Sequence, residues 1–266
     1  MLRKVVFCIF IASLISSGAK SQIIDSACYY VSDFLHHTGN FVTSPLHYGD
    51  EEICDLAKVI SITGLSFIVD KEVHNYSQDG KHRSDFLSHL AKIDNYYGDT
   101  KYTIILLGGT LLTGVVTSSK EIFNAGFMLS ESVLFSNIIT QSLKRVIGRE
   151  RPDFTSNNLH LIGPNLSLDQ YQSLPSGHAT TAFALSTVAA GLTKNTYLKI
   201  LCYTPAFLTS LARIYNNRHW LSDVVLAGSI GYYTGKKVLE MNGKSDENES
   251  LKINVGFNSV GIIFQF

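Results

Sequence analysis

Apolar side chains recur every three or four residues through the middle of this chain, which is the spacing of one face of an α-helix. The pattern runs through Ile53 to Val69, Ile104 to Val116 and Ile122 to Ile147. No proline occurs between Pro45 and Pro152, so this stretch lacks the residue that most strongly breaks helices. The same spacing predicts three further helices after residue 174, which are His178 to Leu192, Tyr197 to Tyr215 and His219 to Leu239.

One apolar segment is long enough to raise the question of a membrane. Tyr102 to Ser119 is an uncharged run of 18 residues, the lower edge of transmembrane length. It contains three glycines and four threonines, and we interpret it as a buried core helix rather than a membrane span. Elsewhere charges such as Glu131 interrupt the apolar runs, which argues against a chain of six lipid-facing spans.

The two ends of the chain have different patterns. Residues 1–21 read as a signal peptide, with Arg3 and Lys4 before an apolar stretch from Val5 to Leu14 and small residues near position 21. An uncleaved anchor is the alternative, and either one exports the rest of the chain. At the other end, residues 242–266 read as a polar linker followed by two alternating runs with a turn near Asn258, which predicts a β-hairpin. We expect it to pack on the helical body, since one hairpin cannot close a barrel.

Composition limits the classes of function. With 266 residues, 45% hydrophobic and 17% charged, the chain can bury one sizeable core and is expected to form a single domain. Basic and acidic residues balance at 22 each, so net charge indicates no nucleic-acid partner. After the predicted signal, Cys28, Cys54 and Cys202 remain, an odd number without CxxC spacing, which indicates neither a disulfide framework nor a zinc cluster. A Cys28 to Cys54 bridge and three buried thiols are both compatible with this count.

The first stretch that carries chemistry contains two cations. Lys144 and Arg151 are seven residues apart, two helical turns, so we expect both on one face of a helix that Pro152 ends. Arginine supplies a planar fork of donors and lysine a point charge, a pairing suited to clamp an oxyanion. Taken alone, the stretch also fits a solvated basic helix face.

The second stretch is Pro175-Ser176-Gly177-His178. Ser176 is a good helix-capping residue, and Gly177 lets backbone N–H groups approach a ligand closely, so the turn predicts an anion cradle at a helix start. His178 then stands in the first turn, within reach to protonate a leaving-group oxygen. An ordinary serine cap beside an incidental histidine is the alternative.

The third stretch pairs an imidazole with a carboxylate. His219 and Asp223 are at i and i+4 of a helix expected to begin near Trp220, so the carboxylate can accept the Nδ1–H of the ring. An imidazole oriented in this way keeps Nε2 free as a nucleophile. Arg213, six residues before His219, can reach the same anion. A surface His/Asp pair is the alternative for this stretch alone.

Taken together, the three stretches resemble the signature K-x6-RP, PSGH and SR-x5-H-x3-D of the type 2 phosphatidic acid phosphatase and vanadium haloperoxidase superfamily. The match covers 80 residues, from Lys144 to Asp223. The resemblance implies an all-α fold, a compact multi-helix bundle of the acid phosphatase/haloperoxidase type, here over residues 22–241 with the short C-terminal hairpin after it. One departure is Ala212, where the family has serine; we expect it to affect rate rather than mechanism.

The resemblance also implies a role for each matching residue. His219 is the nucleophile, Asp223 its orienting partner and His178 the acid for the leaving group. Phosphoryl oxygens would bind to five residues, namely Lys144, Arg151, Ser176, Gly177 and Arg213. Fixed donors of this kind stabilise the charge of a transferring phosphoryl group, so no metal is required.

The expected activity is therefore hydrolysis of phosphomonoesters or pyrophosphates through a phosphohistidine, on substrates that include lipid phosphates of the phosphatidic acid or isoprenyl pyrophosphate type. The expected location is the periplasm or the outer face of the inner membrane. A vanadate-dependent haloperoxidase, with vanadate as a phosphate mimic, a soluble acid phosphatase and a degenerate anion-binding protein are the alternatives. Because His178 must be protonated while His219 is not, an acidic to neutral optimum is expected.

Two further sets of residues have weaker interpretations. Asp70 and the run from Thr43 to His47 are expected near the site entrance. Seven histidines show no metal-ligand spacing and are interpreted as structural or surface groups, namely His36, His37, His47, His74, His82, His89 and His160.

Overall fold

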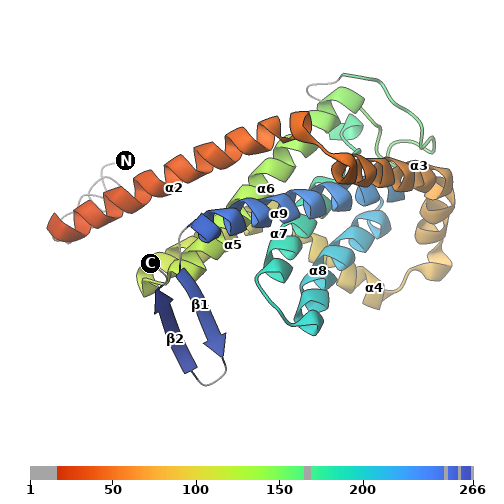
Figure 1. Ribbon diagram of the computed structural model, residues 1–266. Helices are drawn as coiled ribbons and strands as arrows, with labels where there is room; N and C mark the ends of the chain where they lie inside the picture. The colour runs from red at the N-terminus through yellow and green to blue at the C-terminus, as the bar shows by residue number, and fades with distance from the viewer. Residues whose placement is uncertain (1–16, 165–168, 249–250, 257–258, 265–266) are drawn as a thin grey trace, which may run out of the picture. The chain divides into compact units, whose positions relative to one another are not determined.

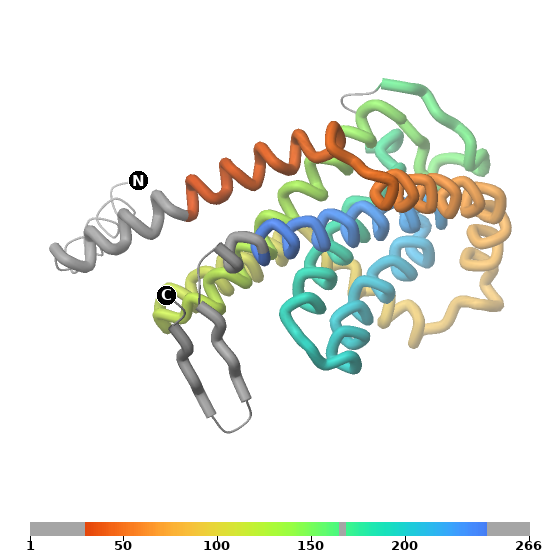
Figure 2. Tube along the Cα trace, in the orientation of Figure 1, coloured from red at the N-terminus to blue at the C-terminus, as the bar shows by residue number. Residues whose placement is uncertain are grey.

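The computed structural model describes residues 17–164, 169–248, 251–256 and 259–264. Side chains are described for residues 30–164 and 169–243 (Figure 2). The charged start and apolar stretch of the predicted signal peptide lie outside the described residues. The chain divides into two compact units, residues 1–48 and 49–266. In the first unit, the described residues form helix α2 (Ser17–Thr43) and the short 3₁₀ helix η1 (Ser44–His47).

The second unit confirms the all-α fold and contains all six predicted helices (Figure 1). A short helix, α4, was not predicted. The helices of this unit are α3 (Asp50–Gln78), α4 (Asp85–Leu90), α5 (Thr100–Thr117), α6 (Lys120–Ile147), α7 (Gly177–Gly191), α8 (Thr196–Tyr215) and α9 (Leu221–Asn248). Three 3₁₀ helices join them, η2 (Gly80–His82), η3 (Ala91–Asn95) and η4 (Asp169–Tyr171).

The chain ends in the predicted β-hairpin. Strand β1 (Leu251–Gly256) pairs antiparallel with β2 (Ser259–Phe264), with Gly256 opposite Ser259 at the turn. Helix α9 continues to Asn248 and so includes most of the segment predicted as a linker. The reason is that this polar segment contains no proline, and polarity alone does not end a helix.

Helix α7 lies at the centre of the second unit and packs against α6, α8 and α9. Its small side chains allow close approach, and Ala179, Ala182 and Ala184 are fully buried. On α9, Gly231 faces α7 so closely that a Cβ there would lie 2.4 Å from the carbonyl oxygen of Thr180. A side chain at position 231 would therefore force the two helices apart. Overpacking a core in this way destabilises a fold.

Polar side chains fix α6 against α7. The Thr140 and Thr180 hydroxyls lie 3.0 Å apart, and the Asn137 amide donates to the Thr181 hydroxyl at 3.0 Å. These bonds pair polar groups at the contact between the two helices, where buried polar groups need hydrogen-bond partners. These bonds set the register between Lys144 at the end of α6 and the first turn of α7.

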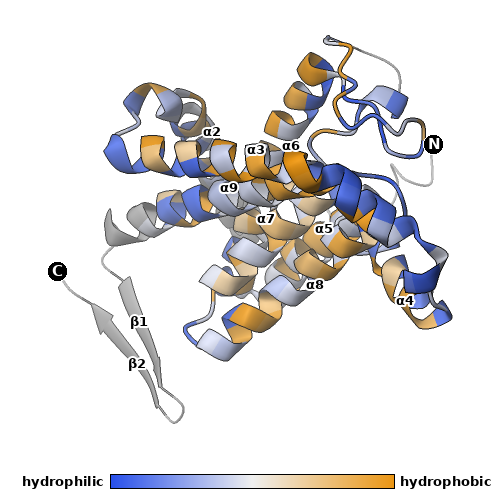
Figure 3. Ribbon diagram, turned by 90° about the vertical axis from the view of Figure 1, so that its right-hand side faces the viewer, coloured by the Kyte–Doolittle hydropathy of each residue, from blue (hydrophilic) through white to orange (hydrophobic). Residues whose placement is uncertain are grey.

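The interpretation of the uncharged run as a buried core helix is wrong. Helix α5, which contains this run, leaves most of its apolar side chains exposed, for example Ile104 at 64% and Val116 at 74%. Figure 3 colours much of this helix as hydrophobic. By length and composition, α5 and α6 are both apolar enough to cross a membrane. Glycine and threonine did not mark the helix as core, because both are common in membrane-spanning helices.

The described cysteines are free thiols. Cys54 is exposed and Cys202 is half-buried, so neither is the buried thiol that one interpretation of the cysteine count required. The side chain of Cys28 lies outside the described residues.

Candidate active site

Six of the eight predicted site residues line one cavity of about 310 Å³. They are Lys144, Arg151, Gly177, His178, Arg213 and His219. The other two, Ser176 and Asp223, are fully buried directly beside this wall. The three sequence stretches therefore converge on a single hollow in the second unit.

The two cations of the first stretch do not share a helix, contrary to the prediction. Helix α6 ends at Ile147 because Gly148 adopts a left-handed conformation, with φ of 62°. A Cβ at Gly148 would also lie 2.1 Å from the carbonyl oxygen of Gly163, so this turn requires glycine. Lys144 reaches the cavity from the last turn of α6, and Arg151 reaches it from the following loop.

Each cation is held by a neighbouring acceptor. Arg151 donates to the Asp169 carboxylate at 2.6 Å and to its backbone oxygen at 2.9 Å. Arg213 donates to the carboxylate of Asp94 at 3.0 Å, and Lys144 donates to the backbone oxygen of Gln172. These contacts fix the side chains without using all of their donors.

Three buried donors beside the cavity have no partner among the described residues. They are one terminal nitrogen of Arg151 (Nη1), Nε of Arg213 and the hydroxyl of Ser176. Ser176 is the N-cap residue of α7, as predicted, but its hydroxyl does not cap the helix. A buried donor without a partner costs about 1–3 kcal/mol, so an oxyanion that accepts these bonds would bind with that cost relieved.

His178 stands in the first turn of α7 with 30% of its side chain exposed. Its Nε2 lies 3.8 Å from the carboxylate of Asp99, a neighbour that the sequence did not reveal. Asp99 caps α5 by accepting from the backbone of Lys101, so its only visible signal was that of a capping residue. Burial and then the charge of Arg213 lower the pKa of His178 to about 4.

His219 lies at the wall of the cavity and is 3% exposed. Its Nδ1 is 3.5 Å from the Asp223 carboxylate, within ion-pair range but longer than the predicted hydrogen bond. That carboxylate oxygen accepts instead from the Ser173 hydroxyl at 2.5 Å and the Trp220 backbone N–H at 2.8 Å. Burial, then Arg213 and Lys144, hold the pKa of His219 well below its usual range, so the ring is neutral and its lone pair is available.

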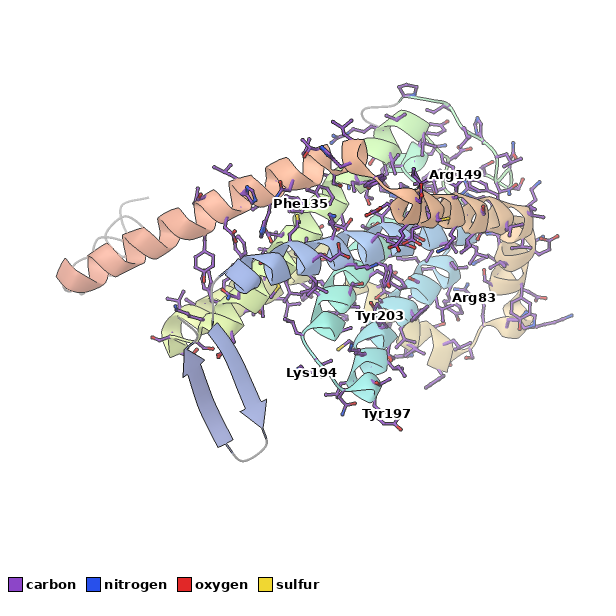
Figure 4. The ribbon with its side chains drawn as sticks, viewed as in Figure 1. Arg83, Phe135, Arg149, Lys194, Tyr197 and Tyr203 are labelled. Carbon is purple, nitrogen blue, oxygen red and sulfur yellow. The ribbon has the colours of Figure 1, made fainter. Side chains whose placement is uncertain are left out.

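Sequence reasoning misplaced Asp70 and missed Arg149. Asp70 does not lie at the entrance: it is fully buried on α3 and accepts from Arg149 at 2.6 Å. Arg149 also donates to Asp223 at 2.6 Å. Figure 4 labels the position of Arg149. An acidic residue on a predicted helix gives no sequence signal of such a distant partner.

The other histidines of the second unit fit the structural interpretation where their contacts are described. The ring of His74 packs 5.1 Å from that of Trp220, and His160 pairs with Glu150 at 2.5 Å. Among the described residues, no group of three or more His, Cys, Asp or Glu side chains is arranged to hold a metal ion.

Comparison with known proteins gives a family match and several relatives. Residues 125–246 match the model of the PAP2 superfamily. Lipid A 1-phosphatases from three organisms are similar in sequence. The enzyme of Porphyromonas gingivalis is 36% identical over 35% of this chain and 18% of its own length. The enzyme of Rhizobium johnstonii is 29% identical over 54% of this chain and 64% of its own length. The enzyme of Rhizobium etli is 31% identical over 40% of this chain and 45% of its own length. The chain thus spans less than two thirds of each relative.

Two solved structures are also similar. LpxE of Aquifex aeolicus has a TM-score of 0.48 and 22% identity, and the match covers 64% of this chain and 93% of that one. A transmembrane PAP2-type phosphatidylglycerolphosphate phosphatase from Bacillus subtilis has a TM-score of 0.47 and 19% identity, over 81% and 96%.

Proposed function

We propose that this chain, whose residues 125–246 match the PAP2 superfamily, is a phosphatase of that superfamily that hydrolyses lipid phosphate esters through a phosphohistidine on His219. One observation carries the proposal. Four cationic side chains and two histidines line a single cavity, and three buried donors next to it lack partners among the described residues. The cations are Lys144, Arg151, Arg213 and Arg218. A tetrahedral phosphoryl group is an anion that would satisfy these donors together.

The proposed reaction has two steps. In the first, Nε2 of His219 attacks phosphorus, the bond to the leaving oxygen breaks, and His178 gives that oxygen its proton. In the second, water attacks the phosphohistidine, His178 takes a proton from the water, and phosphate leaves. Lys144, Arg151 and Arg213 stabilise the charge on the phosphoryl oxygens in both steps, which requires no metal.

The low pKa of His178 shapes how the acid is supplied. Without a bound phosphate this ring is neutral at pH 7, because burial and then the charges of Arg213 and Lys144 lower its pKa. A bound phosphate brings negative charge beside the ring and favours its protonated form. The proton that His178 donates then comes from the substrate monoanion or from solvent. The reactive complex of enzyme and substrate must hold this proton, and it loses the proton at alkaline pH.

The apolar surface supports a lipid substrate. Helices α3, α5 and α8 carry exposed apolar side chains such as Ile68 at 70%, Val116 at 74% and Tyr197 at 83%. Soluble monomers rarely expose large apolar patches, and α5 at about 27 Å nearly matches the apolar thickness of a bilayer. Relatives of this chain are named lipid A 1-phosphatases, and that name describes an enzyme that acts on a lipid phosphate. We propose a membrane-associated enzyme that acts outside the cytoplasm.

A substrate panel tests this proposal. The full chain, purified in detergent, would be given phosphatidic acid, an isoprenyl pyrophosphate, lipid A and a water-soluble aryl phosphate, with phosphate release as the readout. We expect release from at least one lipid at a higher kcat/KM than from the aryl phosphate, and none from the His219→Ala variant. A preference for the soluble ester would remove the lipid assignment, and an active His219→Ala variant would remove the mechanism.

A further inference from the structure

Three charged side chains stand behind His219, outside the wall of the cavity. Asp223 is 3.5 Å from His219, Arg149 is 2.6 Å from Asp223, and Asp70 is 2.6 Å from Arg149. The side chains of Asp223, Arg149 and Asp70 are fully buried. This charged row links the ring of His219 to helix α3, which supplies none of the residues that line the cavity.

The guanidinium of Arg149 is held on every side. One terminal nitrogen donates to Asp223 and to the Ser222 hydroxyl, the latter at 2.7 Å. The other donates to Asp70 at 2.6 Å and to the backbone oxygen of Asn158 at 2.5 Å, and Nε donates to the same backbone oxygen at 3.0 Å. The rings of Phe67 and Trp220 cover it at 4.3 and 5.5 Å. Little freedom remains for this group.

Asp70 is the anchor of the row. One of its oxygens accepts from the Ser222 backbone N–H at 2.8 Å, and the other accepts from the Ser222 hydroxyl at 2.6 Å as well as from Arg149. Asp70 therefore fixes both Arg149 and the first turn of α9, which carries Asp223. A buried ion pair rarely stabilises a fold more than an apolar pair of the same size would, so packing alone does not account for these charges.

The charges fit the proposed chemistry. Two carboxylates and one guanidinium leave a net charge of −1 in the row. When His219 attacks phosphorus its ring becomes cationic, and the row then balances that charge in a site surrounded by other cations. We propose that Asp70 and Arg149 are positioning residues, which hold the Asp223 carboxylate in place and charged behind the nucleophile. This inference rests on the proposed function.

The two positions should shift the acid limb of the kcat/KM profile in opposite directions. Asp70→Asn removes a negative charge, which disfavours the cationic ring of His219 and moves the limb to lower pH. Arg149→Gln removes a positive charge and moves it to higher pH. The other groups that face His219 remain the same in both variants, namely Lys144 from α6, Arg151 from the loop, His178 from α7, Arg213 from α8 and Asp223 from α9.

The experiment measures kcat, KM and the acid limb for the full chain, for each single variant and for the double variant. We expect kcat of each single variant to fall about 10- to 100-fold with little change in KM, as is typical when an outer partner of a functional histidine is lost. The double variant should lose less than the product of the two single losses, because the two side chains contact each other directly and belong to one network. Asp55→Asn, a change at a partly exposed carboxylate on the same helix, is the matched control and should keep the parent values.

Near-UV circular dichroism checks that each variant is folded, and the double variant, which restores the parent net charge of −1 in the row, serves if a single variant is not. Parent values of kcat and acid limb in folded Asp70→Asn, or limbs that shift in the same direction for both single variants, would overturn the inference. Those results leave the proposed function standing. Failure of the parent to release phosphate in the same assay would overturn the proposed function and the inference together.

Discussion

The cavity wall and the outer helix faces invert the usual distribution of polar and apolar side chains. Lys144, Arg151 and Arg213 are only 5–9% exposed, whereas Val116 and Tyr197 are 74% and 83% exposed. Charged groups are normally the exposed ones. The contrast fits the proposed function, in which the cavity binds an anion and the outer helix faces contact a membrane.

The inversion is tolerated because each buried cation is compensated. Arg213 is paired with Asp94, and Arg151 with Asp169. Two guanidinium nitrogens without a partner among the described residues, Nη1 of Arg151 and Nε of Arg213, lie beside the cavity. Outside, no such pairing is needed, since apolar side chains cost little in a bilayer. Substitutions in the cavity wall should therefore alter phosphate hydrolysis. Substitutions on the outer helix faces should alter only how the protein partitions into membranes.

The largest effect is expected at the nucleophile. His219→Ala removes the atom that attacks phosphorus, and loss of a covalent nucleophile typically costs about 10⁴-fold or more in kcat. Steady-state phosphate release checks this, with His74→Ala as a control, because that ring packs on Trp220 outside the cavity wall. A variant that keeps more than a tenth of the parent rate would contradict the role of His219.

The next largest effect is expected at the anion clamp. Arg213→Ala removes a preorganised donor, for which losses of about 10²- to 10³-fold in kcat are typical. Arg145→Gln is the matched control, since that arginine belongs to the same basic stretch but is exposed. Equal kinetics for the two variants would mean that the cavity does not select phosphate by charge.

A smaller effect is expected in the pH profile. Because the pKa of His219 is held well below 6.5, its neutral form persists in acid, and the acid limb of kcat/KM should lie below pH 6.5. The alkaline limb should fall near the second pKa of a phosphate monoester, about 6, because the productive complex needs one proton. An acid limb above pH 6.5 would contradict the environment described for His219.

The smallest effect on kcat is expected for substitutions on the exposed face of α5. Ile105 on α5 is 61% exposed, and Ile105→Lys should leave kcat for a soluble aryl phosphate unchanged within about twofold. It should lower the fraction of protein that partitions into detergent or membranes, because a lysine at the centre of a span costs about 3 kcal/mol. Ile105→Val is the matched control. Unchanged partitioning of the lysine variant would remove this face from the proposed membrane contact.

Helix positions and the members of the site were predictable from sequence, but their surroundings were not. Periodicity predicted α3 and α5 to α9, and the spacing of three motifs predicted which side chains share the cavity. The break at Gly148 was missed because seven-residue spacing looks helical whether or not a glycine intervenes. Asp70 and Asp99 were missed as partners because each depends on contacts between distant segments, with Arg149 and His178 respectively. The exposure of α5 depends on its surroundings, which composition does not reveal.

The central claim is that phosphate passes through His219. A His178→Ala variant given an aryl phosphate with a good leaving group should complete the first step, which then needs no acid, and stall before hydrolysis, which lacks its base. Rapid quenching followed by peptide mass spectrometry should find an acid-labile phosphate on the peptide that contains His219. Phosphate on another residue, or full turnover by this variant with no phosphopeptide and no burst of aryl alcohol, would contradict the account.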